Sequence, residues 1–559
     1  MIIKYKKIVE KYIKDIQSEK ILSCVYVKQM IERHLNDLKR DDIYFDEDAA
    51  NHFLKFSALC KYTKGELAKN GKHIELTPQQ VLRYWILFGW KNLDGTRRFR
   101  KVYFELARKN GKSEEASIVA CYGLIADKEF GAEIYTAGTK REQAKIVFDG
   151  SREMLRKLKG DSKKIDSLVS ISKYNCNVIN TNSKLEPLAS DSEKQDGLNP
   201  HFAIIDEYHA HRNSDLLEVI ETGQGSRSQP LLFIITTAGF NRVSACYQLR
   251  KVATEILSGK KEDDSFLACI FTLDEGDDYN EPKNWVKANP NLGITPRLEY
   301  LEQQHLKVKN EGKSKEVQFL TKNLNIWTDS SMAWIKASDW ELCGTDNFPD
   351  LKGKECFGGL DLASVSDNNS FVLVFPIEGK LYVRAWFWIP EETAKRKNEI
   401  ADYLRWVDEG FVRTTPGQVI DQKIITRDIL EICKEYNLKS FAFDPFIAYN
   451  GVVQDLTDEG LKGFEHRQGF LSMSTPSKDF EKRVKQMEII HNNNPCLAWQ
   501  IGNVELEIDA SDNIKPSKKK SAEKIDGVVA MVMAINTYLN LGREDDSSSP
   551  YNERGIIFI

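Results

Sequence analysis

The segment KVYFELARKNGKSEEASIVACYGL (101–124) has the residues of a phosphate-binding loop. An apolar run leads into Gly111-Lys112-Ser113, and a helical pattern follows. In a strand–loop–helix unit of this kind, backbone N–H groups and the lysine surround the phosphates of a nucleotide, while the serine hydroxyl faces a bound magnesium ion. Leu106 stands where the usual pattern G-x-x-x-x-G-K-[ST] has its first glycine. The segment therefore predicts a nucleotide site whose loop departs from the common form.

A second copy of the triplet, Gly312-Lys313-Ser314, shows how little three residues mean alone. It lies in HLKVKNEGKSKEVQFL, a charged helical or loop stretch with no buried strand before it. Because a phosphate-binding loop needs the preceding strand, we interpret this copy as accidental. The strand context, and not the triplet, supports the prediction for the first copy.

Two acids, Asp206 and Glu207, follow the buried apolar run Phe202–Ile205. An aspartate at such a strand end can hold magnesium through water, and the adjacent glutamate can activate the attacking water. The alternative is an ordinary strand capped by acids, which explains the pair poorly once the loop is considered. Another apolar run, Leu231–Ile235, ends in Thr236-Thr237-Ala238-Gly239, at the position that senses the γ-phosphate in nucleotide motors.

Three aspartates of the second half stand where a metal-dependent nuclease would have them. Asp361 and Asp444 each end an apolar run, and Asp526 opens the apolar helical stretch IDGVVAMVMAI. A ribonuclease-H-like fold brings such acids together, and they repel one another unless divalent metals bind between them. Two Mg²⁺ or Mn²⁺ ions about 4 Å apart then activate water and stabilise the leaving oxygen of a phosphodiester. Singly, each aspartate is equally well explained as a turn former or helix cap.

The apolar patterns predict the elements that position these residues. Residues 1–75 have amphipathic helical spacing, and residues 100–240 alternate short apolar runs with helical segments. Runs that are apolar throughout indicate a parallel sheet with helices on both faces. We therefore predict an α/β protein, with a helical N-terminal extension, a P-loop NTPase domain and a ribonuclease-H-like nuclease domain. From residue 355, successive strands of a meander are expected, at Phe357–Leu362, Ser370–Phe375 and Leu381–Trp388, before a strand at Ser440–Phe443 and the helix Ile525–Leu541.

The expected domain limits follow from these patterns. They are a helical extension at 1–75, a P-loop ATPase domain with connector at 76–330, a nuclease domain at 350–543 and a flexible acidic tail at 544–559. The turn-rich NPNLGITP (289–296) is interpreted as a connector.

Composition limits the class of protein. A length of 559 residues suggests two large domains, and a net charge of −4 counts against a passive DNA-coating protein. The ten cysteines have no CxxC spacing, which argues against a zinc site and a disulfide scaffold. The longest apolar stretch, 527–535, is about half the length that crosses a bilayer. We expect a soluble intracellular protein with no membrane contact.

Taken together, the motifs resemble the large terminase subunit of tailed bacteriophages over about residues 45–540. ARKNGKS (107–113) is that family's departing form of the P-loop. The other matching segments are YTAGTKREQAKIVF (135–148), DGLNPHFAIIDEYHAHR (196–212), QPLLFIITTAG (229–239), WVKANPNLG (285–293) and LNIW (324–327).

The resemblance implies roles for individual residues. Lys112 and Ser113 would bind phosphate and magnesium, Asp206 would order the magnesium and Glu207 would be the catalytic carboxylate. Arg108 matches the arginine inside the family's loop, a candidate cis arginine finger for the γ-phosphate. Gln80 aligns with a glutamine that reads adenine, although its neighbour Gln79 is the competing choice and a helix-surface glutamine the alternative for both. Asp361, Asp444 and Asp526 match the nuclease triad.

Three further residues and one basic run each have a functional and a structural interpretation. Arg227 would act in trans on a neighbouring subunit's ATP or be a solvated loop arginine. Asp367 would be an outer metal ligand or a turn residue, and Lys524 would touch phosphate or face solvent. The basic run KPSKKKSAEK (515–524) would contact the DNA backbone or be a solvated loop.

The function that the resemblance implies is a viral DNA-packaging motor. Using ATP with Mg²⁺, it would drive double-stranded DNA into procapsids, and it would cut concatemeric DNA with two Mg²⁺ or Mn²⁺ ions. A small terminase subunit, the portal protein and a homo-oligomeric ring are the implied partners, and the host cytoplasm is the implied location. A helicase–nuclease of repair or restriction and a structural scaffold with decayed sites are the rival interpretations.

Overall fold

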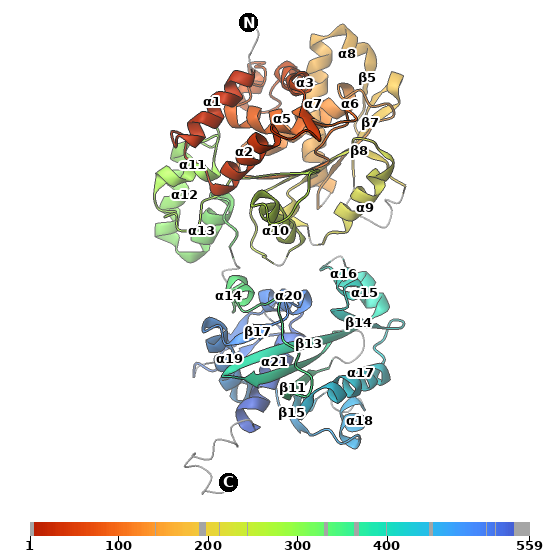
Figure 1. The fold of residues 1–559 in the computed structure, drawn as a ribbon, viewed down its shortest axis with the longest axis vertical. Coiled ribbons are helices and arrows are strands. Elements are labelled where there is room, and N and C mark those ends of the chain that lie inside the picture. Colours follow the sequence, from red (N-terminus) through yellow and green to blue (C-terminus); the bar gives the residue numbers. More distant parts are fainter. Residues whose placement is uncertain are drawn as a thin grey trace. The chain divides into compact units, whose positions relative to one another are not determined.

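The computed structural model describes residues 5–139, 141–188, 197–211, 213–242, 244–328, 334–362, 368–398, 400–446, 451–509, 511–519, 521 and 523–541. The chain divides into two compact units, Met1–Thr328 and Asp329–Ile559 (Figure 1). Asp367 and the tail predicted at 544–559 lie outside the described residues. Each unit is built on its own sheet.

The first unit contains an eight-stranded sheet in the order β10-β3-β9-β8-β4-β7-β6-β5. The first six strands in this order run parallel, and β6 and β5 are antiparallel additions. Every residue of β8 and β9 is buried, so both faces of the sheet are covered, as the uniformly apolar runs predict. The strands are β3 (Lys101–Glu105), β4 (Glu133–Ala137), β5 (Val169–Ile171), β6 (Cys176–Val178), β7 (Ser183–Pro187), β8 (Pro200–Asp206), β9 (Leu231–Thr236) and β10 (Phe266–Ile270).

Helices join and cover these strands. The helix that follows β3 begins at Lys112, directly after the predicted loop. The longer helices of this part are α5 (Pro78–Gly89), α6 (Lys112–Ile125), α7 (Arg141–Asp161), α9 (Asp215–Gly223) and α10 (Ala245–Leu257). The predicted P-loop NTPase architecture is therefore confirmed in this unit.

The N-terminal helices belong to the same core as the sheet. Buried side chains of α1, α2 and α3 join one hydrophobic cluster with those of β3, β8 and β9. A short strand, β1 (Ile43–Phe45), also pairs with β2 (Trp90–Asn92). The elements of this region are α1 (Tyr5–Gln17), α2 (Val25–Asp37), α3 (Glu47–Leu59) and α4 (Gly65–Lys69). The predicted helices are present, and they pack as part of the first unit.

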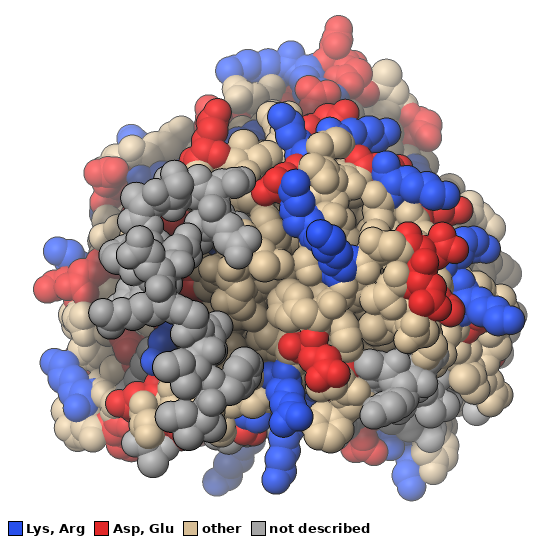
Figure 2. Space-filling view, turned by 90° about the horizontal axis from the view of Figure 1, so that it is seen from below, with Lys and Arg blue, Asp and Glu red and all other residues tan. Residues whose placement is uncertain are grey.

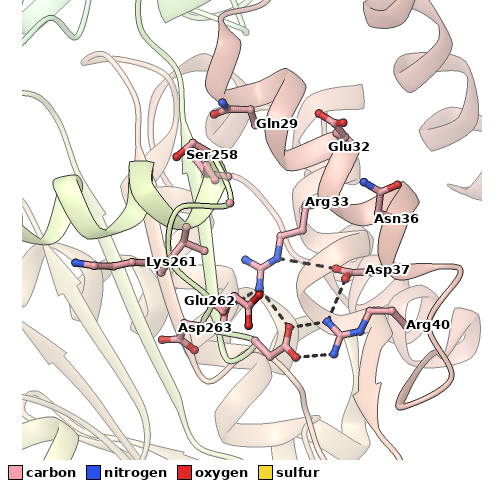
Figure 3. Close-up of a pocket in the computed structure, with 14 residues that line it drawn as sticks. Gln29, Glu32, Arg33, Asn36, Asp37, Arg40, Ser258, Lys261, Glu262 and Asp263 are labelled. Atoms are coloured by element: carbon pink, nitrogen blue, oxygen red, sulfur yellow. Dashed lines mark hydrogen bonds and ion pairs between the residues drawn. The ribbon is translucent and has the colours of Figure 1, made fainter.

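An ion-pair network attaches α2 to the edge of the sheet (Figure 3). Arg40, drawn in Figure 3, donates to Asp264 Oδ2 over 2.6 Å. Arg98, which the figure does not draw, donates to Asp37 Oδ2 over 2.7 Å. Hydrogen bonds from Arg40, followed by those from Arg98, hold the pKa of Asp264 well below its usual range. The network lines a cleft of about 610 Å³ that contains none of the predicted site residues. We interpret it as a structural attachment.

The first unit ends in a further group of helices. These are α11 (Trp285–Ala288), α12 (Leu298–Glu311), α13 (Lys313–Gln318) and a π-helical turn at Phe319–Asn323. Gly312 stands between α12 and α13, so the second GKS lies in helical surroundings, as its charged pattern predicts.

The second unit contains a seven-stranded sheet in the order β14-β13-β12-β11-β15-β16, with β17 paired to β13. The strands β11, β12 and β13 form the predicted antiparallel meander, and β15 runs parallel to β11. This order, with a helix against the central strand, is the predicted ribonuclease-H-like arrangement. The strands are β11 (Glu355–Asp361), β12 (Asn369–Ile377), β13 (Lys380–Pro390), β14 (Val412–Thr415), β15 (Asn437–Phe443), β16 (Gly463–Glu465) and β17 (Ile489–His491).

The last helix, α21 (Asp526–Leu541), lies directly on β11. A Cβ at Gly359 would come within 1.9 Å of the Ala530 carbonyl oxygen, so only glycine allows this close approach. Thr537 Oγ1 donates to the Gly358 carbonyl over 3.0 Å. The contact fixes the start of α21 relative to the end of β11.

Helices and a hairpin complete the second unit. They are α14 (Ala337–Leu342), α15 (Glu391–Lys397), α16 (Tyr403–Asp408), α17 (Gln422–Glu435), α18 (Val452–Asp458), α19 (Phe470–Lys485), α20 (Pro495–Asn503) and the hairpin of β18 (Leu506–Ile508) and β19 (Ile514–Pro516). Within the described part of the chain, every helix is too short or too polar to span a membrane.

Candidate nucleotide and nuclease sites

The loop between β3 and α6 has a backbone conformation that favours glycine at position 111. Gly111, the N-cap of α6, has a φ of 86°, in the left-handed region that favours glycine. The Lys112 ammonium donates to the carbonyls of Leu106 and Ala107 over 2.7 and 3.0 Å. Burial lowers the pKa of Lys112 to about 8, against the opposing charges of Glu207 and Asp206. The loop thus holds a buried lysine just beyond the end of β3.

The two acids at the end of β8 face this loop. Ser113 Oγ donates to Asp206 Oδ2 over 3.2 Å, so the structure brings the serine and the aspartate together. Burial raises the pKa of Asp206 to about 6, and the charge of Glu207 adds to the effect. Glu207 has a φ of 53°, an uncommon backbone conformation for a residue with a side chain. Burial raises its pKa too, but His209, Lys112 and Arg108 outweigh burial and bring it to about 2.

The predicted connector NPNLGITP supports the loop. Asn110 Nδ2 donates to Asn289 Oδ1 over 2.9 Å, and Asn291 Nδ2 donates to the Asn110 carbonyl over 3.1 Å. Thr295 Oγ1 also donates to the Lys109 carbonyl over 2.6 Å. Turn-rich composition indicates a loop but not its partners, so this role was missed.

Gln80 lies beside the phosphate loop, with its amide already in use. Its Nε2 donates to Glu115 over 2.8 Å, and its Oε1 accepts from the Thr77 N–H over 2.8 Å. A Cβ at Gly111 would lie 3.7 Å from this Nε2. Gln79 is buried as well and donates to Asn291 Oδ1 over 3.0 Å. Neither glutamine is a helix-surface residue, and a role of Gln80 toward adenine stays a prediction.

The two arginines considered for catalysis differ in environment. Arg108 lies in the loop with an exposed side chain, and its charge contributes to the low pKa of Glu207. Arg227 donates instead to the carbonyls of Asn199 and Gly131 and to Glu129, which ties two loops together. These contacts favour a structural role for Arg227 over a solvated one.

Two further residues, His209 and Lys322, belong to this site and were missed. His209 Nδ1 lies 3.1 Å from Glu207 Oε2, and its Nε2 lies 3.2 Å from the Lys322 ammonium. The Lys322 carbonyl accepts from the Arg108 N–H over 2.9 Å. Burial lowers the pKa of Lys322 to about 8, and the neighbouring charge of Arg108 adds to the effect. The histidine of DEYH was visible beside the acids, but a lysine 115 positions after Glu207 carried no local signal.

The segment after β9 also joins the network. The Leu106 N–H donates to the Thr236 carbonyl over 3.2 Å, which links it to the phosphate loop. The Ala238 N–H donates to Asn325 Oδ1 over 2.7 Å. Hydrogen bonds therefore join the end of β9 and the residues after it to the phosphate loop and to the last residues of the first unit.

In the second unit, Asp361 and Asp526 lie on either side of Lys518. The lysine donates to Asp361 Oδ2 over 2.6 Å and lies 3.1 Å from Asp526 Oδ1. Burial raises the pKa of Asp526 to about 6; Lys518 lowers it and the Asp361 carboxylate raises it. Gln468 Nε2 also donates to Asp361, over 3.0 Å. Two buried carboxylates thus share one positive charge.

Asp444 follows β15 at the same edge of the sheet. Leu360 pairs with Phe443, so Asp361 and Asp444 are the next residues on neighbouring parallel strands. Asp444 accepts from the Phe446 N–H over 3.1 Å. Among the described residues, however, no three acidic, histidine or cysteine side chains form one metal-binding group. The structure brings Asp361 and Asp526 together and leaves Asp444 beside them.

The basic run 515–524 supplies the cation of this site. Lys518 was not singled out from the sequence, because five lysines in ten residues look alike there. Lys524 contributes a weaker positive charge near Asp526. Figure 2 shows acidic and basic side chains interspersed on the visible face, among the residues that are coloured. The positive charge recorded at the acids comes from Lys518 and, more weakly, from Lys524.

The fold and these two sites define a class of protein that combines a P-loop ATPase with a ribonuclease-H-like nuclease. Two family models match the chain. The terminase large subunit ATPase domain matches residues 78–255, and the terminase large subunit endonuclease domain matches residues 260–541. The chain belongs to the terminase large subunit family. It is an ATP-hydrolysing motor that packages viral DNA and an endonuclease that cuts it.

Three relatives illustrate the similarity. Protein YmfN of Escherichia coli (strain K12) is 35% identical over 65% of this chain and 82% of its own length. The terminase large subunit of Enterobacteria phage HK97 is 29% identical over 85% of this chain and 93% of its own length. The crystal structure of the HK97 bacteriophage large terminase aligns with a TM-score of 0.50 and 27% identity, over 87% of this chain and 99% of that one.

Proposed function

We propose that Lys112, Ser113, Asp206 and Glu207 carry out ATP hydrolysis. Lys112 binds the phosphates, Ser113 and Asp206 hold the magnesium ion that accompanies ATP, and Glu207 orients and activates the attacking water. The low pKa of Glu207 keeps it ionised, as a base must be. Gly111 presents the backbone N–H groups of the helix start, and Gln80 would exchange its hydrogen bonds to Glu115 and Thr77 for contacts to the base. The observation that carries this proposal is the contact of Ser113 with Asp206.

Arg108 is proposed as the cation that acts on the γ-phosphate within the same chain. It lies in the loop between Ala107 and Lys112, and its side chain is exposed. A guanidinium placed there stabilises the charge that develops on the transferred phosphoryl group.

For the nuclease, we propose that Asp361, Asp444 and Asp526 hold two Mg²⁺ or Mn²⁺ ions. The donors fit such ions, because carboxylate oxygens are their preferred ligands. Among the described residues, none donates a hydrogen bond to Asp526 Oδ2, although this oxygen is buried. Lys518, which contacts both Asp361 and Asp526, supports the proposal, because it supplies a positive charge where the metals would bind. Bound metals would activate water and stabilise the leaving oxygen of the phosphodiester.

The proposed partners follow from membership of the family. Several copies form a ring on the portal protein of an empty procapsid, together with a small terminase subunit, in the host cytoplasm. ATP hydrolysis drives double-stranded DNA inward, and the nuclease cuts the concatemer.

The direct test is an assay of both activities in the purified chain. DNA-stimulated ATP hydrolysis and plasmid cleavage are measured with Mg²⁺, with Mn²⁺ and with a chelator. Both activities should need a divalent metal. Cleavage that persists in the chelator would exclude the metal-dependent nuclease.

A further inference from the structure

A chain of polar contacts leads from Glu207 to the last residues of the first unit. Glu207 Oε2 lies 3.1 Å from His209 Nδ1, and His209 Nε2 lies 3.2 Å from the Lys322 ammonium. An ammonium only donates hydrogen bonds, so Nε2 must accept and the imidazole proton must be on Nδ1. That proton is directed at Thr236 Oγ1, which lies 3.2 Å from Nδ1, while Glu207 Oε2 is close to the same nitrogen without forming a hydrogen bond with it.

His209 is fixed from several sides, so its position is defined. The backbone N–H of His209 donates to Thr236 Oγ1 over 2.9 Å, and the imidazole Nδ1 lies 3.2 Å from the same hydroxyl. Thr237 Oγ1 lies 3.3 Å from Nδ1. Only 9% of the imidazole is exposed. The ring therefore links the carboxylate, the end of β9 and Lys322.

Lys322 is held at its own end by the phosphate loop. Its carbonyl accepts from the Arg108 N–H over 2.9 Å, and its ammonium lies 4.9 Å from the centre of the Phe240 ring. The adjacent Asn323 carbonyl accepts from Asn289 Nδ2 over 2.7 Å. Backbone contacts at both residues fix the π-helical turn against the loop and its support.

We infer that Lys322, acting through His209, positions the Glu207 carboxylate for ATP hydrolysis. The inference rests on the proposed role of Glu207. Glu207 has a left-handed backbone at the start of the 3-10 turn Tyr208–Ala210, and its side chain does not cap that turn, so its orientation depends on other side-chain contacts. Lys322 and His209 are positioning residues here, and a misplaced carboxylate costs up to about 10²-fold in rate.

The test uses the full chain with H209A, K322M, K322R and the double variant H209A/K322M. Lys307, an exposed lysine of α12, supplies the matched control K307M. DNA-stimulated ATP hydrolysis gives kcat and KM, and ADP binding and the melting temperature are measured for each variant.

We expect K322M and H209A each to lower kcat by about tenfold or more, with the Kd for ADP unchanged within about threefold. The double variant should be no slower than the slower single variant, because both changes break the same series of contacts from Lys322 to Glu207. K322R keeps a donor and should recover most of the activity, and K307M should match the unchanged protein.

Two outcomes would overturn the inference. One is a kcat for K322M equal to that of K307M; the other is a double variant whose loss is the product of the two single losses. If K322M does not fold, K322R decides the matter, because a tenfold loss there with normal melting would contradict a shared donor role. E207Q distinguishes the failure of the proposed function from the failure of this inference. Full ATPase activity in E207Q would refute the proposed role of Glu207. Loss of activity in E207Q with normal activity in K322M would refute only the role of Lys322 and His209.

Discussion

Lys518 is the residue whose position says most about the nuclease. Its ammonium contacts Asp361 and Asp526, two carboxylates that would otherwise repel each other in a buried place. A divalent metal that binds these acids must compete with this lysine. Lys518 therefore sets the balance between the metal-free and the metal-bound site.

We predict that Lys518→Met lowers the melting temperature of the second unit in chelator and increases the stabilisation that Mn²⁺ provides. The first effect follows from the lost counter-charge, and the second from the lost competitor. Thermal melts with chelator and with Mn²⁺ measure both. Lys519→Met, a change of the exposed neighbour, is the control. An Mn²⁺ shift equal to that of the unchanged protein would show that Lys518 does not compete with metal.

The site residues that lie in a local sequence motif could be predicted, and those that are brought to a site from a distant part of the sequence could not. Lys112 and Ser113 follow a strand within one motif, and Asp206 ends another strand, so local pattern sufficed to expect their meeting. Lys322 is far in sequence from Glu207, and Lys518 is far from Asp361, and no residue spacing in the sequence indicates that the two lysines lie at these sites. Burial and charge at such positions are determined only by the assembled structure.

At the scale of elements, the stretch Phe319–Thr328 connects the first unit to the second along the chain. Asn325, fully buried with a φ of 55°, accepts from the Ala238 N–H and donates to the Phe271 carbonyl, each over 2.7 Å. Trp327 Nε1 donates to the buried Glu105 over 3.1 Å. The stretch therefore contacts the end of β3 and the residues that follow β9 and β10.

We predict that Asn325→Ala destabilises the first unit by at least about 2 kcal/mol, because two buried backbone groups lose their partners. Asn325→Gly loses the same hydrogen bonds but tolerates the positive φ, so it should be about 1 kcal/mol more stable than the alanine variant. Urea unfolding followed for the first unit compares the two. An alanine variant within 0.5 kcal/mol of the unchanged protein would contradict this account.

The elements themselves were largely predictable. The short, uniformly apolar runs became β3, β8 and β9, since buried strands of a parallel sheet are apolar on both faces. The strand β10 was missed because its apolar run lies in a charged region without a repeating pattern. The small strands β5 and β6 were missed as well, because three-residue pairs carry almost no periodicity.

At the scale of the whole molecule, the structural boundary differs from the start of the endonuclease family match. That match begins at residue 260, but the first unit continues to Thr328. Residues 266–270 form β10 beside β3, and Asn325 contacts the end of β9. These residues complete the ATPase unit.

We predict that a fragment of residues 1–328 folds cooperatively and binds ADP, whereas a fragment of residues 1–259 does not fold. The shorter fragment lacks the edge strand β10 and the support of the phosphate loop by Asn289 and Asn291. Circular dichroism melts and ADP binding compare the two. Cooperative melting of the shorter fragment would place the boundary at the start of the family match instead.

The central claim is that one chain contains two separate catalytic sites. The most direct measurement is ATP hydrolysis and DNA cleavage by Glu207→Gln and Asp361→Ala in the full chain. We predict that Glu207→Gln abolishes DNA-stimulated ATP hydrolysis and keeps cleavage, and that Asp361→Ala does the reverse. If both activities survived both substitutions, the assignment of the two sites would be contradicted.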